Sequence, residues 1–236
     1  MVEVRLTEGQ DGVMARKFRS LSAEATEELG RRLGEQLWAG AVLTLDGDLG
    51  AGKTTFVRGL AEGLGIEDGV ASPTYTLMQQ HDGGRLPLFH FDAWMEGREK
   101  ALLADGADEF FGHEGVSVVE WAGRIEAWLP SPRLAIQLRH DTPETRWISL
   151  RREGGEPNSG AGASPGVASS ADAQAGTGRA AVPEQGLASA AAPGATGRID
   201  ALLRGLESSP ELVEGGPPGV LSKEAEPGPG PGVEGL

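Results

Sequence analysis

The sequence predicts an α/β fold with a mainly parallel sheet and antiparallel additions, followed by a low-complexity C-terminal region. Two patterns predict the fold class: short apolar strands alternate with helical segments, and a glycine-rich loop joins one strand to the next helix. The third observation is composition, because all twelve aromatic residues lie at or before Trp147 and ten of the fifteen prolines follow Gly154. We therefore expect one folded domain, residues 1–154.

The first half of this domain is expected to contain two strands and two helices. Residues 2–6 alternate in polarity and predict a short edge strand. Ser20 or Ser22 caps a helix through "EATEELGRRLGEQLW", which has acidic residues in its first turn. A buried strand at 41–45 leads into the glycine-rich loop, and a helix at 54–64 follows it.

The second half is expected to contain three more strands, short helices and a terminal hairpin. The strands are expected at residues 72–82, which begin with a Ser-Pro turn, at 86–94 and at 116–121. The short helices are expected within 100–110 and at 122–129. The two strands of the hairpin are expected at 133–140 and 145–152.

The glycine-rich loop, "GDLGAGKT", fits the phosphate-binding pattern G-x-x-x-x-G-K-[ST] at Gly47, Gly52, Lys53 and Thr54. Glycine allows positive φ and a close approach of backbone N–H groups to phosphate oxygens, and the following helix directs its positive end at the same anion. Lys53 is expected as a solvent-side charge on the outer phosphates, and the Thr54 hydroxyl as a Mg²⁺ ligand. The pattern predicts a P-loop NTPase fold.

Two carboxylates stand where apolar strands end, Asp92 after "PLFHF" and Glu120 after "SVV". A phosphate loop needs a further carboxylate for Mg²⁺ or for the attacking water, and the carboxyl ends of parallel strands meet at that loop. The alternative for each is a solvated loop charge. His90 shares a strand face with Asp92 and is interpreted as a structural histidine.

The segment "SPTYTL" lies where many nucleotide-dependent switches keep a threonine that senses Mg²⁺ and the γ-phosphate. Thr74 and Thr76 are the candidates, and a plain strand entry is the alternative. Trp94, Trp121 and Trp128 are interpreted as packing residues, although Trp121 borders the second carboxylate.

Composition excludes several other functions. The net charge of −14 makes the chain a poor stand-alone binder of nucleic acid, and the absence of cysteine excludes disulfides, thiolate metal sites and a cysteine nucleophile. No apolar run approaches membrane-spanning length, and residues 1–10 have no signal-peptide core. We expect a soluble cytoplasmic protein that does not bind membranes.

Taken together in this order, "GDLGAGKTTF", "SPTYTL", "FHFDAW" and "VVEW" resemble the TsaE (YjeE) family over about residues 20–150. These are small bacterial ATPases of tRNA threonylcarbamoyladenosine modification. The resemblance implies Mg²⁺-dependent ATP hydrolysis that drives cycles of a larger assembly with TsaB-type and TsaD-type partners. The TsaD-type subunit carries out the transfer, so this chain would meet tRNA only indirectly.

The resemblance also implies roles for particular residues. Lys53, Asp92 and Glu120 are the expected catalytic residues, with Thr54 and Glu120 as Mg²⁺ ligands and Asp92 assisting the metal or the water. The expected nucleotide-binding set is Glu24 and Thr26 near the base, and Asp48, Leu49, Gly50, Ala51, Gly52, Lys53, Thr54 and Thr55 at the phosphates.

The chain departs from the family pattern at two places. The family usually continues "FDLYR", whereas Met95 stands in the arginine's position here. Either Arg98 supplies the positive charge from the next turn, or this chain lacks the contact that the family's arginine makes.

The family's terminal "LLxxL" helix is matched by residues 197–207, about forty residues late. We expect a disordered low-complexity insertion at 155–193 and a disordered tail at 208–236. The apolar residues of the match recur at helical spacing and predict a helix docked on the domain, with a transient helix as the alternative. They are Ile199, Leu202, Leu203 and Leu206.

Two other functions are compatible with a phosphate loop. A small-molecule or nucleoside kinase normally has an arginine-rich lid, and "KALLADGADEFFGHEGV" has one basic residue apart from its histidine. A non-catalytic, nucleotide-dependent interaction protein is the third hypothesis.

Overall fold

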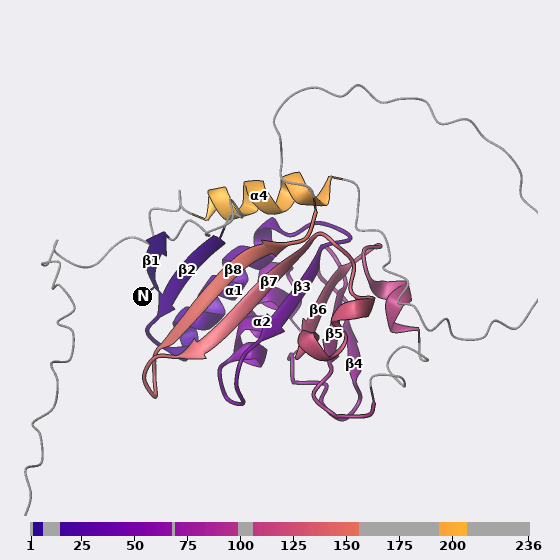
Figure 1. Ribbon diagram of the computed structural model, residues 1–236, viewed down its shortest axis with the longest axis horizontal. Coiled ribbons are helices and arrows are strands. Elements are labelled where there is room, and N and C mark those ends of the chain that lie inside the picture. The colour runs from indigo at the N-terminus through magenta and orange to yellow at the C-terminus, as the bar shows by residue number, and fades with distance from the viewer. Residues whose placement is uncertain (1, 7–14, 68, 99–105, 156–193, 207–236) are drawn as a thin grey trace, which may run out of the picture.

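The computed structural model describes residues 2–6, 15–67, 69–98, 106–155 and 194–206, which form one mixed sheet with helices packed against it (Figure 1). The strands are β1 (Val2–Leu6), β2 (Ala15–Ser20), β3 (Val42–Asp46), β4 (Met78–His81), β5 (Leu88–Asp92), β6 (Val116–Glu120), β7 (Arg133–His140) and β8 (Arg146–Glu153).

The sheet has a parallel centre and antiparallel margins. Its strand order is β1-β2-β8-β7-β3-β6-β5-β4. Strands β7, β3, β6 and β5 are parallel, β8, β2 and β1 add antiparallel on one side, and β4 adds antiparallel on the other. The predicted α/β fold class, a parallel sheet with antiparallel additions, is therefore confirmed.

Strand β2 is the element that sequence analysis does not predict. Its burial alternates, with Arg16, Phe18 and Ser20 buried, but its hydropathy does not. Arg16 occupies an inward position because its Nε donates a hydrogen bond to the carbonyl of Leu203, 3.0 Å away. A tertiary contact thus stabilises a strand that the local pattern of polar and apolar residues does not predict.

The segment after β6 also differs from expectation. Instead of one short helix at 122–129, the chain forms two 3₁₀ helices, η2 (Ala122–Arg124) and η3 (Glu126–Trp128). They are separated by Ile125, which is fully buried. A third, η1 (Ala107–Phe110), lies within the helical segment expected at 100–110.

Several sequence-based expectations concern residues outside the described ranges. These are 99–105, most of the insertion expected at 155–193, and the tail expected at 208–236, so all three stay predictions. Within the described ranges, no helix is both long enough and apolar enough to cross a bilayer.

Helices α1 (Ala23–Gln36) and α2 (Lys53–Gly63) cover one face of the sheet (Figure 1). The side chain of Ser22 caps α1 by accepting a hydrogen bond from the backbone N–H of Ala25, at 3.2 Å, which confirms a serine cap there. Apolar side chains of both helices join residues of β3, β7 and β8 in the larger of two buried clusters.

Glycines form the contact between α1 and α2. Gly30 and Gly34 on α1 face Gly59 and Gly63 on α2. The two glycines of each helix are four residues apart, about one turn. A Cβ added at Gly59 would lie 1.9 Å from the carbonyl oxygen of Glu27, so a larger residue would force the helices apart. This seam fixes the start of α1 beside the glycine-rich loop.

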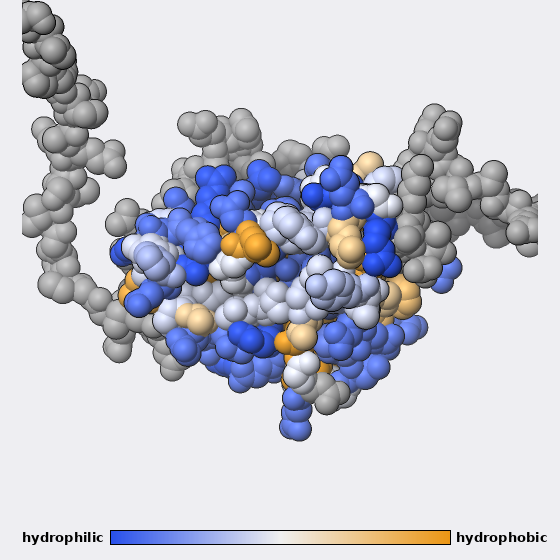
Figure 2. All heavy atoms as spheres, turned by 90° about the horizontal axis from the view of Figure 1, so that it is seen from below, coloured by the Kyte–Doolittle hydropathy of each residue, from blue (hydrophilic) through white to orange (hydrophobic). Residues whose placement is uncertain are grey.

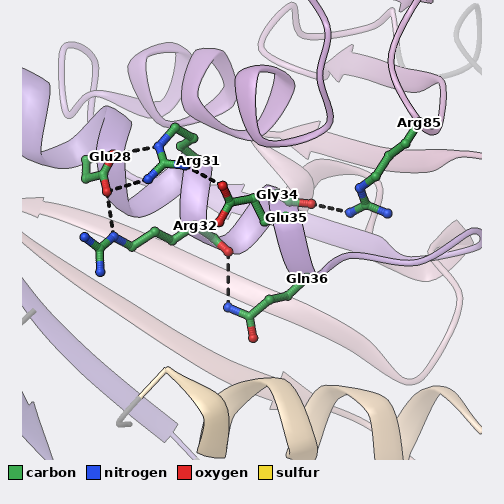
Figure 3. A network of polar contacts seen from close by, with 7 residues as sticks. All are labelled: Glu28, Arg31, Arg32, Gly34, Glu35, Gln36 and Arg85. Carbon is green, nitrogen blue, oxygen red and sulfur yellow. Dashed lines mark hydrogen bonds and ion pairs between the residues drawn. The ribbon is translucent and has the colours of Figure 1, made fainter. Parts of the chain in front are cut away.

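The outer face of α1 has a polar network (Figure 3). Glu28 accepts hydrogen bonds from Arg31, at 2.7 and 2.8 Å, and from Arg32, at 2.6 Å. The hydrogen bond from Arg31, helped by Arg32, lowers the pKa of Glu28 to about 2. Arg85 donates to the carbonyl of Gly34 and ties the helix to the β4–β5 connection.

Helix α4 (Ala195–Gly205) lies across the end of the sheet at which β3 begins and β8 finishes (Figure 1). The apolar side chains that the helical spacing marks as a docking stripe are all buried there. They are Ile199, Leu202, Leu203 and Leu206.

A buried ion pair fixes α4 to the sheet. Arg152 Nε lies 3.0 Å from Asp200 Oδ1, and each side chain is 6% exposed. Arg152 also donates to the carbonyls of Gly154 and Gly155, at 2.6 and 3.2 Å. Both charges are therefore compensated where they are removed from water.

Candidate nucleotide and magnesium site

The glycine-rich loop joins β3 to α2 in conformations that favour glycine. Gly47, Gly50 and Gly52 have φ angles of 151°, 75° and 99°. A Cβ at Gly47 would also lie 2.4 Å from the carbonyl oxygen of Leu138 on β7. Because α2 begins at Lys53, its unpaired N–H groups and the positive end of its dipole are available to an anion.

Lys53 is buried, with 6% exposure, so the expectation of a solvent-side lysine is wrong. Its Nζ donates to the carbonyls of Gly47 and Asp48, at 2.8 and 3.1 Å, and lies 3.8 Å from the ring centroid of Trp121. Burial lowers the pKa of Lys53, and the charge of Glu120 opposes that shift. The loop and the indole thus enclose a cation close to carboxylates.

Glu120 ends β6 and is buried, with 2% exposure. Its Oε1 lies 3.1 Å from Thr54 Oγ1 and 3.0 Å from His90 Nε2. The structure thus brings together the two residues expected to ligate Mg²⁺. Parallel pairing of β5 with β6 also sets Asp92 directly opposite Glu120.

Asp92 ends β5 and accepts three hydrogen bonds. Its Oδ2 lies 2.9 Å from Ser72 Oγ and 2.6 Å from Thr74 Oγ1, and its Oδ1 lies 2.8 Å from the backbone N of Trp94. Of the two candidate threonines, Thr74 therefore contacts Asp92, whereas Thr76 donates to the backbone carbonyl of Pro73 in its own turn. Sequence reasoning missed Ser72, whose only signal is its spacing of two from Thr74.

A hollow of about 370 Å³ lies between the loop and these strand ends. It collects the three expected catalytic residues, both expected metal ligands, and Leu49, Gly50, Gly52 and Thr55 of the expected phosphate set. Two expected residues do not line this hollow: Ala51 is fully buried and lines the second hollow described below, and Asp48 is exposed, with its backbone carbonyl accepting a hydrogen bond from Lys53. The full lining is Leu49, Gly50, Gly52, Lys53, Thr54, Thr55, Ser72, Thr74, Asp92, Trp94, Glu120 and Trp121.

A second hollow, of about 310 Å³, lies on the other side of the same loop. Glu24 and Thr26 line it together with loop residues, so the structure places them where a base could follow the phosphates. Pro143, Glu144 and Arg146 of the β7–β8 turn line it too. Sequence reasoning missed these three, because only the folded hairpin carries them to the loop.

This end of the molecule is mostly hydrophilic. Figure 2 views it from below Figure 1 and shows hydrophobic residues only in small separate groups. Two exposed hydrophobic residues, Leu49 and Trp94, line the larger hollow. Such a surface suits a charged, water-soluble ligand better than an apolar one.

Aromatic rings form one wall of the larger hollow. Trp94 and Trp121 lie 4.4 Å apart between centroids, and Trp121 has a left-handed φ of 59°. The two rings contact each other and also border the hollow, so their interpretation as packing residues stays a prediction. Arg98, the candidate substitute for an arginine at Met95, donates instead to the carbonyl of Tyr75, at 3.3 Å, and lines neither hollow.

The donor set fits Mg²⁺ bound together with a phosphate. Within the described ranges, no three His, Cys, Asp or Glu side chains gather into a metal site made by protein alone. Mg²⁺ in nucleotide sites needs only one or two protein oxygens, because waters and phosphates supply the rest. Thr54, with Glu120 beside it, provides such oxygens next to an anion-binding loop.

Comparison with known proteins identifies the family of this chain. The family model described as threonylcarbamoyl adenosine biosynthesis protein TsaE matches residues 20–148. The TsaE protein of Bacillus subtilis (strain 168) is 43% identical over 139 residues, which are 58% of this chain and 86% of that protein. The TsaE protein of Treponema pallidum (strain Nichols) is 42% identical over 120 residues, 51% of this chain and 88% of that protein.

A solved structure gives the same result. The crystal structure of Bacillus subtilis YdiB matches with a TM-score of 0.53 and 39% identity, over 60% of this chain and 88% of that one. The family model covers more than half of the present sequence and spans the glycine-rich loop and both strand-end carboxylates. The chain therefore belongs to the TsaE family, whose members are described as tRNA threonylcarbamoyladenosine biosynthesis proteins.

Proposed function

We propose that this chain is a cytoplasmic, Mg²⁺-dependent ATPase that drives the cycle of the tRNA threonylcarbamoyladenosine-modifying assembly. It acts beside TsaD-type and TsaB-type subunits rather than transferring the group itself, and it meets tRNA only through that assembly. The observation that carries the proposal is the meeting of a phosphate loop with two buried strand-end carboxylates in one hollow.

Each group has a role in phosphate chemistry. The N–H groups of the loop and of the first turn of α2 bind phosphate oxygens, and Lys53 adds a full positive charge from within the loop. Thr54 and Glu120 would hold Mg²⁺, which supplies charge stabilisation at the transferring phosphoryl group when bound. Asp92, held by three donors, orients the water that attacks.

The nucleotide would lie across the loop. Its phosphates fit the larger hollow and its base the smaller one, where Glu24 and Thr26 are found. The two hollows share Gly50, Gly52 and Thr55, so one extended ligand can occupy both. A mononucleotide, with phosphates at one end and a base at the other, is such a ligand.

The test is phosphate release from ATP by the purified full chain, alone and with TsaD-type and TsaB-type subunits added. We expect release that requires Mg²⁺ and increases with the subunits. Phosphate transfer to a nucleoside or another metabolite, without release to water, would favour a kinase. Nucleotide binding with no turnover under any of these conditions would favour an interaction protein.

A further inference from the structure

A histidine lies directly behind the expected metal ligand. His90 is on β5, fully buried, and its Nε2 is 3.0 Å from Oε1 of Glu120. A carboxylate oxygen only accepts hydrogen bonds, so Nε2 is the donor. We propose that His90 is a positioning residue, which holds Glu120 in the orientation that binds a divalent cation with the nucleotide. This inference rests on the proposed function.

The sheet register explains how the contact arises. His90 pairs with Val118, and Asp92 pairs with Glu120, so His90 lies two residue pairs below the two carboxylates and on the same face. The Glu120 side chain turns back over this position. It is therefore held from the strand side by His90 and from the loop side by Thr54.

Both donors bind the same oxygen of Glu120. The hydrogen bonds of 3.0 and 3.1 Å to Oε1 fix the rotation of the carboxylate, and that rotation sets the direction of Oε2. The Thr54 hydroxyl can ligate the cation through a lone pair and still donate to Oε1, but its position then follows the cation, whereas His90 holds Oε1 from the sheet whether or not the cation is bound. A ligand held this way loses less freedom when the cation binds.

Packing alone does not account for a histidine here. Nδ1 of His90 is buried, and none of the described residues hydrogen-bonds it. An aliphatic side chain would fill similar space without a buried polar atom lacking a partner. The bond to Glu120 supplies a reason for the residue type.

The chain contains a matched control. His81 is also buried, and its ring centroid is 6.4 Å from that of His90. It lies on β4, one strand further from Glu120 in the sheet order. Replacing His81 removes a buried imidazole from the same neighbourhood and leaves the His90–Glu120 bond.

The experiment measures the Mg²⁺ concentration that gives half of the Mg²⁺-dependent rise in melting temperature of the ADP complex. The unmodified full chain is compared with His90→Leu, His90→Gln and His81→Leu, and ADP affinity without Mg²⁺ is measured in parallel. Leucine removes the donor, whereas glutamine carries an amide N–H at about the reach of Nε2.

We expect His90→Leu to raise the half-saturating Mg²⁺ concentration about 10-fold or more, the usual effect of losing such a support. His90→Gln should recover most of this loss. ADP affinity without Mg²⁺ should be unchanged in both, and His81→Leu should have the Mg²⁺ dependence of the unmodified chain. If His90→Leu does not fold, His90→Asn, too short to reach Glu120, should show the same shift.

Two results would overturn the inference. One is an unchanged Mg²⁺ requirement in a folded variant lacking the donor, and the other is an equal shift in His81→Leu. The proposed function is judged separately, by phosphate release from the unmodified chain. If ADP binding by that chain does not respond to Mg²⁺ at all, the metal role of Glu120 and the positioning role of His90 are both refuted.

Discussion

The two ends of the sheet both bury charged groups, yet they compensate them differently. Under α4, Arg152 and Asp200 form a direct ion pair at 3.0 Å. At the opposite end, Asp92 accepts hydrogen bonds from hydroxyl and backbone donors, and Glu120 from Thr54 and His90. Lys53, although near both carboxylates, donates to backbone carbonyls.

We interpret this difference as one between a charge pair that stabilises the fold and charges that, in the proposed function, bind a ligand. A buried pair whose members meet is compensated within the protein, so removing one member leaves the other stranded. Charges that are close but hydrogen-bonded to other groups are typical of functional sites, where stability is not optimised. Substitutions at the α4 end should therefore affect stability, and those at the loop should affect turnover.

The largest expected effect is that of Lys53→Ala on ATP turnover. Losing the full charge from the phosphate site should reduce phosphate release about 100-fold or more. The free energy of unfolding without nucleotide should change by only about 1 kcal/mol, because relief of desolvation offsets the lost contacts. Phosphate release measures the turnover, and urea unfolding measures the free energy of unfolding. Unchanged turnover would refute the phosphate-loop assignment.

The next largest effect is expected from breaking the ion pair under α4. Asp200→Leu should destabilise the protein by about 3–5 kcal/mol, because Arg152 stays buried without its partner. The double variant Arg152→Met with Asp200→Leu should recover most of that loss. Urea unfolding of both single variants and of the double variant checks this. If the two single substitutions lower the free energy of unfolding by amounts that add up in the double variant, Arg152 and Asp200 do not stabilise the fold as a pair.

A smaller effect is expected from the glycine seam. Gly59→Ala should destabilise by about 1–3 kcal/mol, since the new Cβ would meet the backbone of α1. Gly197→Ala on α4 is the control: nothing lies within 4 Å of its Cβ position, so helix propensity should stabilise by up to about 1 kcal/mol. The melting temperature should fall in Gly59→Ala and rise in Gly197→Ala. A rise in both variants would mean that α1 and α2 have room for a Cβ between them.

The smallest effect is expected at Glu28 on the exposed face of α1. Its pKa is lowered from 4.5 to about 2, so its contribution to stability is present above pH 4.5 and is lost as the pH falls towards 2. Exposure and salt limit that contribution to about 0.5 kcal/mol. The difference in unfolding free energy between the parent and Glu28→Gln should narrow from pH 7 to pH 3, and a constant difference would exclude the ion pairs as its cause.

The candidate site could be largely predicted because local rules determine it. A glycine-rich loop between strand and helix predicts where an anion would bind, and parallel apolar strands that end in Asp92 and Glu120 must bring both carboxylates to the same edge of the sheet. Docking of α4 was predictable for a similar reason, from the spacing of its buried apolar residues.

What sequence reasoning missed depends on distant partners. Strand β2 is supported by a contact from Arg16 to α4, and Arg152 pairs with a residue 48 positions later. The centroid of the Trp121 ring lies 3.8 Å from Lys53 Nζ, and Trp121 has a left-handed backbone conformation just after β6. No periodicity or motif predicts these contacts, because each one forms only when elements distant in the sequence pack together.

The most direct test of the account is ATP turnover by Glu120→Gln, which removes the charge and keeps the size of the side chain. The account predicts that turnover falls about 10²–10³-fold, while nucleotide affinity without Mg²⁺ and the free energy of unfolding stay close to those of the unmodified chain. Turnover at the unmodified rate would contradict it, and would assign the principal metal-binding role to Asp92.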